Sequence, residues 1–583
     1  MATLLLTTLL LPLAGAAILP GDRIAARRWA LGIALAVFGM AVVLLARYPG
    51  GTEPFASVDL AWLQQIGSPV DVRFSIAIDG LSVWLFGLTA LLMIVAVLIG
   101  WEAIDEQASL YYRLLLALET GMLGVFVARD ILLFYVFFEF TLIPLFFLIG
   151  IWGSAERRWA AVKFFLFTLA GSVLTFLGLL AIVLWHFFHS AGELTFSIPA
   201  LTAGLRSHPI DPAIQIAIFL ALFAGFAVKV PLFPFHTWLP LAHVEAPTAG
   251  SVVLAGVLLK VGVYGFARFN VAMLPQATAM LMPWLLWLSV AGIIYGAMVA
   301  LAQRDIKRLI AYSSVSHMGF CMLGLFALNQ ISVEGGVLQM VNHGLSTGGL
   351  FAVVGMVYER YHTRQIAELG GLAQRLPILA FFMLVLTLSS IATPGLNGFV
   401  GEFLILLGTF QRCWLNAPSH DWLQYRAIGV LGVSGVILGA WYMLWLYQRV
   451  FFGPLVEPKL SKGRSKSSPP ASEEGHPIRD LGPREIGCLV PLVVLMLWIG
   501  LYPQFFLERM APTLRELTAP AMEAVEKRQI EAEASLKPKE LTCIGKRSSC
   551  GCHWLCQCSE PLTVRHWQSQ WHSETVQTIV PLI

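Results

Sequence analysis

Long apolar runs are the feature that most constrains the fold of this chain. The hydrocarbon core of a bilayer is about 30 Å thick, so a helix needs about 20 apolar residues to cross it. Fourteen runs approach that length, at 2–19, 30–46, 81–101, 110–127, 131–151, 160–188, 214–241, 249–269, 277–301, 309–328, 337–358, 377–410, 428–452 and 486–501. They predict an all-α, polytopic membrane protein with about 14 transmembrane helices.

Charge is scarce and evenly spread. Only 13% of the 583 residues are charged and 57% are hydrophobic, too little charge for the surface of a soluble protein of this size. The lysines and arginines form no concentrated basic face, so we expect no nucleic-acid partner. The expected surroundings are a lipid bilayer.

The distribution of positive charge between loops predicts the orientation. Loops on one side of the predicted helices carry 20 lysines and arginines, and the opposite loops carry 7. Because positively charged loops face the cytoplasm, we expect both termini on the other side of a bacterial inner membrane. The first run is also short enough for a signal peptide. Arg23, Arg27 and Arg28 follow it rather than precede it, which favours a retained helix.

Three segments lie outside the apolar runs. Residues 454–485 are rich in Ser, Pro and Lys and predict a flexible cytoplasmic loop. Residues from 507 to about 534 predict an interfacial helix, and a polar tail follows to 583. Cys550, Cys552, Cys556 and Cys558 in that tail surround His553, a pattern open to a soft metal, to disulfides or to an unstructured extension. We expect the unstructured extension and no metal site.

Ionisable side chains inside the apolar runs are the strongest functional signal. A charge near the bilayer centre costs at least about 2.5–3.5 kcal/mol, so each one is a candidate functional residue. The charged candidates are Glu119, Glu139, Lys229, Lys260 and Glu402, joined by the histidines His317 and His343.

The first run of candidates combines an acid with two lysines. Glu139 is the one charge in 131–151, and it suits either a structural ion pair or proton transfer. Lys229 is followed by Pro231 and Pro234, which break a helix, and broken helices at membrane depth line protein or water. Lys260 lies nine residues before its run ends, so it either serves in the membrane interior or snorkels to the interface.

The second half of the chain repeats this pattern. Glu402 follows a break with Pro394 and Gly395, and Gly/Pro-interrupted segments in corresponding halves are typical of transporters built from inverted repeats. His317 and His343 are either satisfied by small polar neighbours or form a relay between Lys260 and Glu402. We expect a structural or helix-pairing role for Glu119.

These residue types suit proton transfer. Desolvation destabilises the charged form of a buried lysine or glutamate, and an opposite charge nearby restores it. A Glu139–Lys229 pair would therefore hold the lysine protonated, and separating the pair would release the proton along the row. Histidine relays protons in either direction near neutral pH.

Redox chemistry has no place in this chain. The sequence contains no soluble catalytic domain, no dinucleotide-binding GxGxxG at a strand–helix junction and no phosphate loop. We therefore expect no cofactor and no metal in this chain.

Three long motifs resemble one known family. KVPLFPFHTWLPLAHVEAPTAGSVVLAGVLLKVGVYG, RDIKRLIAYSSVSHMGF and MVNHGLSTGGLFAVVGMVYERYHTR occur in the order found in the antiporter-like membrane subunits of proton-translocating NADH–quinone oxidoreductase, respiratory complex I. The resemblance covers about 79–506. It implies fourteen helices, two inverted five-helix repeats, and breaks in the seventh and twelfth spans.

The resemblance also implies a division of the chain and a set of site residues. The segments are N-terminal helices (1–109), a first repeat (110–270), a second repeat (271–453), the loop (454–485), the last transmembrane helix (486–506) and the interfacial helix with its tail (507–583). The implied proton path runs from the Glu139–Lys229 pair through Lys260, His317 and His343 to Glu402. Accessory residues are Asp130, Arg364, His236 and Lys307.

Two positions distinguish this chain within the family. Glu402, in GLNGFVGEFL, is the residue type that chain M has at this position, whereas chains L and N and the multisubunit cation/proton antiporters generally have a lysine there. Leu241, in HTWLPLAH, replaces the usual aspartate, which puts proton entry at the broken helix in doubt.

Four hypotheses follow for function. The leading one is a proton-translocating subunit of a redox-driven complex, with chains L, N and neighbouring subunits as partners. The alternative is a subunit of a multisubunit cation/proton antiporter. A structural scaffold would not need paired charges in broken helices, and a solute transporter finds no binding motif in the sequence.

Overall fold

The computed structural model describes residues 1–583 except 64–69, 190–193, 416, 418–421, 459–477 and 537–583. Residues 1–534 form one unit of the chain. The cysteine-containing tail and most of the loop predicted at 454–485 therefore lie outside the described residues.

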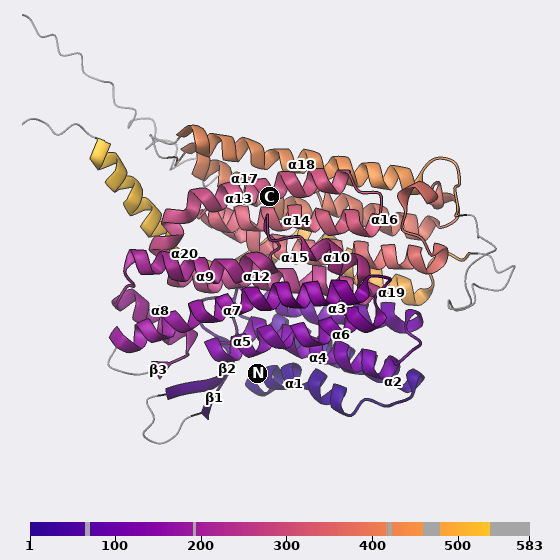
Figure 1. The fold of residues 1–583 in the computed structure, drawn as a ribbon, viewed down its shortest axis with the longest axis horizontal. Coiled ribbons are helices and arrows are strands. Elements are labelled where there is room, and N and C mark those ends of the chain that lie inside the picture. The colour runs from indigo at the N-terminus through magenta and orange to yellow at the C-terminus, as the bar shows by residue number, and fades with distance from the viewer. Residues whose placement is uncertain (64–69, 190–193, 416, 418–421, 459–477, 537–583) are drawn as a thin grey trace, which may run out of the picture. The chain divides into compact units, whose positions relative to one another are not determined.

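Twelve helices of the described chain are long and apolar enough to cross a membrane. They lie side by side with their axes roughly aligned (Figure 1). They are α2 (Arg23–Arg47), α3 (Val83–Ala103), α4 (Ala108–Val127), α5 with α6 (Ile131–Phe140, Leu142–Trp152), α7 (Arg157–His189), α9 (Pro212–Lys229), α11 to η2 (Thr248–Val271), α13 (Pro275–Leu301), α14 (Ile306–Phe326), α15 (Gln330–Tyr361), α18 (Trp422–Phe451) and α19 (Pro483–Leu501). Two shorter apolar helices, α1 (Ala2–Ala17) and α16 (Pro377–Ser390), account for the other two predicted runs.

The two predicted helix breaks are confirmed. After α9 ends at Lys229, the chain passes through a segment containing Pro231 and Pro234 before α10 (Trp238–Glu245) begins. The twelfth run divides into α16 and α17 (Asn397–Phe410), and Gly395 between them has a φ of +90°, a conformation that favours glycine. Both breaks place helix ends inside the bundle, where backbone groups need polar partners.

A small sheet is an addition to the predicted all-helical fold. Strands β1 (Phe55–Leu63) and β2 (Val70–Ile78) form an antiparallel hairpin, and β3 (Leu194–Thr195) pairs with β2 in parallel. The alternation of apolar and polar residues in VDVRFSIAI is typical of a strand. This segment is too short and too polar to count as one of the long apolar runs.

Helix ends that were predicted to face the cytoplasm meet at one end of the bundle. Arg27 donates to the carbonyl oxygen of Trp101 at 2.7 Å, and Arg360 forms an ion pair with Glu485 at 2.8 Å. The hairpin lies with the opposite helix ends, where Arg129 N donates to the carbonyl oxygen of Ser75 at 2.9 Å. The alternation of ends agrees with the fourteen predicted runs.

Helix α20 (Gln504–Leu536) occupies the segment for which an interfacial helix was predicted. Its buried residues Met510, Leu514, Ala521 and Val525 recur on one face of the helix. Near its start, the Thr513 hydroxyl oxygen accepts a hydrogen bond from Gly80 N at 3.1 Å. The helix therefore packs by one face against the helix ends that are predicted to be non-cytoplasmic.

Small residues bring α7 and α9 into close contact. A Cβ atom added at Gly225 of α9 would overlap the hydroxyl of Thr175 and the carbonyl oxygen of Gly171, both on α7. Because α9 ends at Lys229, one turn further, this contact sets the position of the lysine. Close approach through small residues is a general feature of packed membrane helices.

We predict that Gly225→Ala destabilises the protein by about 1–3 kcal/mol, because the added methyl group forces α7 and α9 apart. The amount of assembled protein in membranes and its midpoint of thermal aggregation measure the effect. Gly32→Ala on α2 is the matched control, since nothing lies within 4 Å of a Cβ added there. Equal behaviour of the two variants would contradict the packing argument.

Candidate functional site

Glu139 and Lys229 approach each other from two different helices. Glu139 lies near the end of α5, and Lys229 is the last residue of α9. The two side chains interact electrostatically. Lys229 is only 4% exposed, and its Nζ lies 4.7 Å from the centre of the Phe138 ring. The Lys229 ammonium group therefore lies beside an aromatic ring that attracts it, and the Glu139 carboxylate acts on it from beyond ion-pair distance.

Asp130 holds the start of the helix that carries Glu139. Its carboxylate accepts hydrogen bonds from Leu132 N at 2.9 Å and from Leu133 N at 3.1 Å, and so caps α5. It also accepts a bond from Arg73 N of β2 at 3.3 Å. Burial raises the pKa of the Asp130 carboxyl above its ordinary value, and these backbone donors oppose that shift. The geometry fits the orienting role implied by the family resemblance.

Four predicted residues form a buried row. Lys260 Nζ lies 2.6 Å from His343 Nδ1, and His317 Nδ1 lies 3.1 Å from Glu402 Oε1. The two imidazole rings stand between these contacts, with ring centres 5.6 Å apart. All four residues are at most 5% exposed. The residues come from α12 (Leu259–Gly265), α15, α14 and α17, so the row crosses four separate helices.

Local helix geometry positions Lys260. The turn before it, η1 (Leu254–Leu258), is a π-helix, and Lys260 Nζ donates a hydrogen bond to the carbonyl oxygen of Ala255 inside that turn. A π-helical turn leaves backbone carbonyl groups available for other donors and often occurs at functional sites. Lys260 is fully buried, so the interpretation that it snorkels to the interface is wrong.

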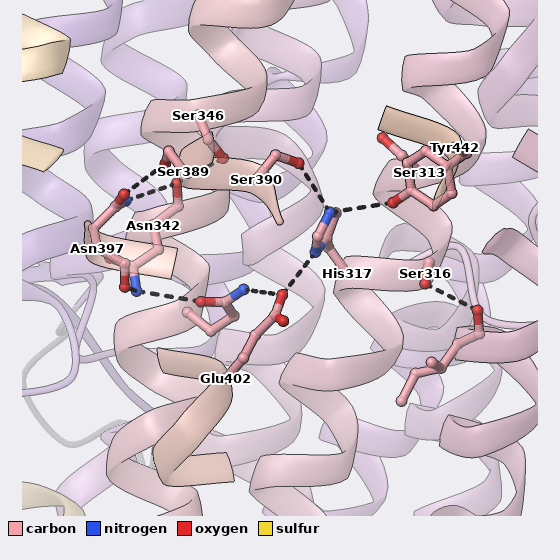
Figure 2. Close-up of polar contacts among 12 residues, drawn as sticks. Ser313, Ser316, His317, Asn342, Ser346, Ser389, Ser390, Asn397, Glu402 and Tyr442 are labelled. Carbon is pink, nitrogen blue, oxygen red and sulfur yellow. Dashed lines mark hydrogen bonds and ion pairs between the residues drawn. The ribbon is translucent and has the colours of Figure 1, made fainter. Parts of the chain in front are cut away.

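Polar side chains surround the His317–Glu402 end of the row (Figure 2). His317 Nε2 lies 3.2 Å from the Ser390 hydroxyl and 3.5 Å from the Tyr442 hydroxyl. Gln339 Nε2 donates to Glu402 Oε1 at 3.1 Å, and Asn342 donates to Gln339 Oε1 at 3.2 Å. The carboxylate and both ring nitrogens of His317 therefore have polar partners at membrane depth.

Hydrogen bonds connect the break before α17 to the same network. Asn342 Nδ2 donates to the backbone oxygen of Asn397 at 2.8 Å, and Ser389 donates to the Asn397 side chain at 2.6 Å. These contacts join α15, the end of α16 and the start of α17, as Figure 2 shows. The same contacts thus position α17 and its Glu402.

His243 is a candidate that the sequence analysis missed. It is fully buried on α10, stacks on Phe351 with ring centres 4.6 Å apart, and has no hydrogen-bond partner on either ring nitrogen within the described chain. Lys260 and Lys307 both act on it electrostatically. The second histidine of HTWLPLAH is the sequence signal for this residue.

The remaining accessory residues surround the broken helix α10. Lys307 Nζ donates to the carbonyl oxygen of Ala246 at 2.6 Å, and Arg364 donates to that of Val244 at 2.7 Å. Arg364 also lies 3.5 Å from Asp305. Both cations thus fix the C-terminal end of α10. His236 packs instead against aromatic rings, with the ring centre of Tyr295 at 5.0 Å.

Glu119 is fully buried on α4, and neither carboxylate oxygen has a hydrogen-bond partner in the described chain, so its expected structural or helix-pairing role stays a prediction. Lys229 and Lys260 are not joined by a hydrogen bond among the described residues. Their helices pack instead through Val230 and Gly262, where an added Cβ would lie 2.5 Å from the valine side chain.

No group of three metal-ligating side chains occurs in the part of the chain that the structure describes. Cys321, Cys413 and Cys488 are buried and unpaired. The cysteine pattern of the tail lies outside the described residues.

Comparison with known proteins identifies the family. Residues 128–419 match the family described as NADH:quinone oxidoreductase/Mrp antiporter, TM. The chain belongs to this family of antiporter-like membrane proteins.

Within the family, the chain is 41% identical to the protein named NADH-quinone oxidoreductase subunit M of Rhodobacter capsulatus, over 89% of this chain and 96% of that one. The predicted resemblance to chain M is confirmed. A chain of the structure titled respiratory complex I from Thermus thermophilus with bound NADH matches with 32% identity and a TM-score of 0.74, covering 88% of this chain and 99% of that one. A chain of the Mrp complex from Dietzia sp. DQ12-45-1b matches with 22% identity and a TM-score of 0.73, covering 90% and 99%. At that identity the likeness concerns the fold alone.

We predict that Asp130→Ala weakens the start of α5 by about 1 kcal/mol, because the two capping hydrogen bonds are lost. Asp130→Asn should restore most of that stability, since asparagine caps helices as well as aspartate does. Thermal denaturation of the purified protein measures both variants. If Asp130→Asn were as unstable as Asp130→Ala, the charge and not the cap would be what holds the helix.

Proposed function

We propose that this chain carries protons across the membrane as the M-type subunit of an NADH–quinone oxidoreductase, while electron transfer takes place in other subunits. One observation carries the proposal: Lys260, His343, His317 and Glu402 form a row buried across four helices, with Lys260 in contact with His343, His317 in contact with Glu402, and the two imidazole ring centres 5.6 Å apart. Burying four ionisable groups next to one another in a membrane is costly, and proton transfer is the function that requires it.

Successive groups along the row can each accept a proton and donate it to the next group. Each imidazole has two nitrogens, and one can accept a proton while the other releases one. His343 faces Lys260 through Nδ1, and His317 faces Glu402 through Nδ1 and hydroxyl groups through Nε2. The two rings face each other in between, at a distance that a bound water or a small ring movement bridges.

The Glu139–Lys229 pair supplies the driving switch. While the carboxylate is near, it holds the lysine protonated; when the two separate, desolvation favours release of the proton. Moving one charge against 100 mV costs about 2.3 kcal/mol. A change of about two pKa units corresponds to about 2.7 kcal/mol, so opening one such pair is sufficient.

The partners follow from the same proposal. A subunit without redox centres needs neighbours that oxidise NADH and reduce quinone, so this chain works next to other membrane subunits, including chains L and N. The membrane is the bacterial inner membrane. The relatives named NADH-quinone oxidoreductase subunit M and the match to a complex I chain support this assignment.

A cation/proton antiporter subunit is the alternative function. The family description covers both kinds of complex, and the Mrp chain shares the fold. Glu402 favours the complex I assignment, because it is the glutamate expected of chain M. Sodium tolerance of cells lacking this chain separates the two: the antiporter function predicts a marked loss of tolerance, and the complex I function predicts loss of NADH-driven acidification.

We predict that Lys229→Ala and Glu139→Ala each lower NADH-driven acidification of the reconstituted complex at least tenfold and reduce NADH oxidation with it, because the switch pair is destroyed. Glu139→Asp keeps the carboxylate and should retain more activity than Glu139→Ala.

Lys527→Ala is the matched surface control, since this lysine is 79% exposed on α20. Equal subunit composition of the purified complexes excludes an assembly defect. Wild-type rates of both oxidation and acidification in Lys229→Ala and Glu139→Ala would rule out the proposed switch.

A further inference from the structure

An apolar groove lies between helices to which neither Glu139 nor Lys229 belongs. It has a volume of about 210 Å³ and is lined by α2, α3, α15, α19 and the start of α20. Every residue that lines it is apolar. A groove of this kind has no group with which to hold a polar solute, so its occupant must itself be apolar along most of its length.

The groove matches the depth of one bilayer leaflet. On α2 its lining runs from Phe38 to Ala46, near the helix end predicted to be non-cytoplasmic. At about 1.5 Å per residue this corresponds to about 12 Å. The hydrocarbon of one leaflet is about 15 Å thick, half of the bilayer core. The groove therefore extends from the non-cytoplasmic interface almost to the membrane centre.

Aromatic rings and one arginine mark the interfacial end. Trp84 packs on Phe506 with ring centres 4.7 Å apart, and Trp498 packs on Phe505 at 4.9 Å. Tryptophan and other aromatic rings prefer this level of a membrane. Arg509 lies over Phe505, its guanidinium 3.8 Å from the ring centre, and its Nη1 donates a hydrogen bond to the carbonyl oxygen of Phe505 at 2.9 Å.

We propose that this groove binds one acyl chain of an anionic phospholipid from the non-cytoplasmic leaflet, with the lipid phosphate at Arg509. The apolar wall takes the chain, and the guanidinium supplies the opposite charge and N–H donors that a phosphate oxygen requires. The bilayer around the protein supplies this ligand at high local concentration.

The bound chain would lie directly behind the proton path. Val341 and Leu345 line the groove on α15 and flank His343 in sequence, and Leu88 of the groove wall touches α15 at Gly344. The lipid thus fills space next to the helix that holds one imidazole of the row. Removing it leaves an unfilled groove there, which lowers the rigidity of that helix.

The test uses the intact complex in vesicles with a phosphatidylglycerol that carries a photoreactive diazirine near the end of one acyl chain. Labelled peptides are located by mass spectrometry. Val42→Trp places an indole in the groove, because Val42 lines it and is 46% exposed. Val43→Trp is the matched control, since Val43 is 45% exposed on the same helix but outside the groove.

We expect labelling of the α2, α3 and α19 peptides to fall at least fivefold in Val42→Trp and to stay within twofold of wild type in Val43→Trp. Arg509→Gln should remove the preference for phosphatidylglycerol over phosphatidylcholine, whereas Arg528→Gln, further along α20, should not. Equal labelling in the two tryptophan variants overturns the proposal, as does cross-linking of the groove to a neighbouring subunit. Labelling without NADH is independent of proton transport, so this result and the proposed function fail separately.

Discussion

The structure depends on one constraint: lipid offers no hydrogen bonds, so a charge at membrane depth is costly unless the protein supplies a partner. Lys260 contacts His343, Glu402 contacts His317 and Gln339, and the Lys229 ammonium group lies against the Phe138 ring. The helices are interrupted beside these same groups, at the end of α5, after Lys229, at η1 and before α17. The breaks supply the backbone groups and the space that the buried charges need.

The positions of the acid and the base are exchanged between the two halves of the bundle. In the first half the acid lies on α5 and the base at the break of the seventh span. In the second half the base, His317, lies on α14, and the acid, Glu402, lies just after the break of the twelfth span. If 110–270 and 271–453 are inverted repeats, these pairs occupy corresponding positions with acid and base exchanged. A proton leaving one pair then finds an acceptor of the other kind in the next, which suits transfer in one direction.

The sequence predicted those features of the fold that depend on short segments of the chain. Twenty-residue apolar runs predicted the spans, and proline and glycine predicted both breaks, because membrane thickness and missing N–H groups act on short segments. Isolated charges identified the row from Lys260 to Glu402 for the same reason. Its polar support was not predictable: Gln339, Asn342 and Asn397 are unremarkable in sequence and gain importance from contacts between α15 and α17. His243 was missed because its two lysine neighbours lie on other helices. Glu119 is conspicuous in the sequence as an isolated charge, but its carboxylate has no hydrogen-bond partner within the described chain.

The central claim is that protons pass between the two imidazole rings. The most direct measurement is the rate of acidification together with the rate of NADH oxidation in vesicles containing the complex with His317→Phe, which keeps a ring of similar size but removes both nitrogens. The account predicts that acidification falls at least tenfold, while Ser434→Ala, a change at a hydroxyl outside the row, leaves it at the wild-type value. A fully assembled His317→Phe complex with wild-type rates of both oxidation and acidification would show that protons do not use this row.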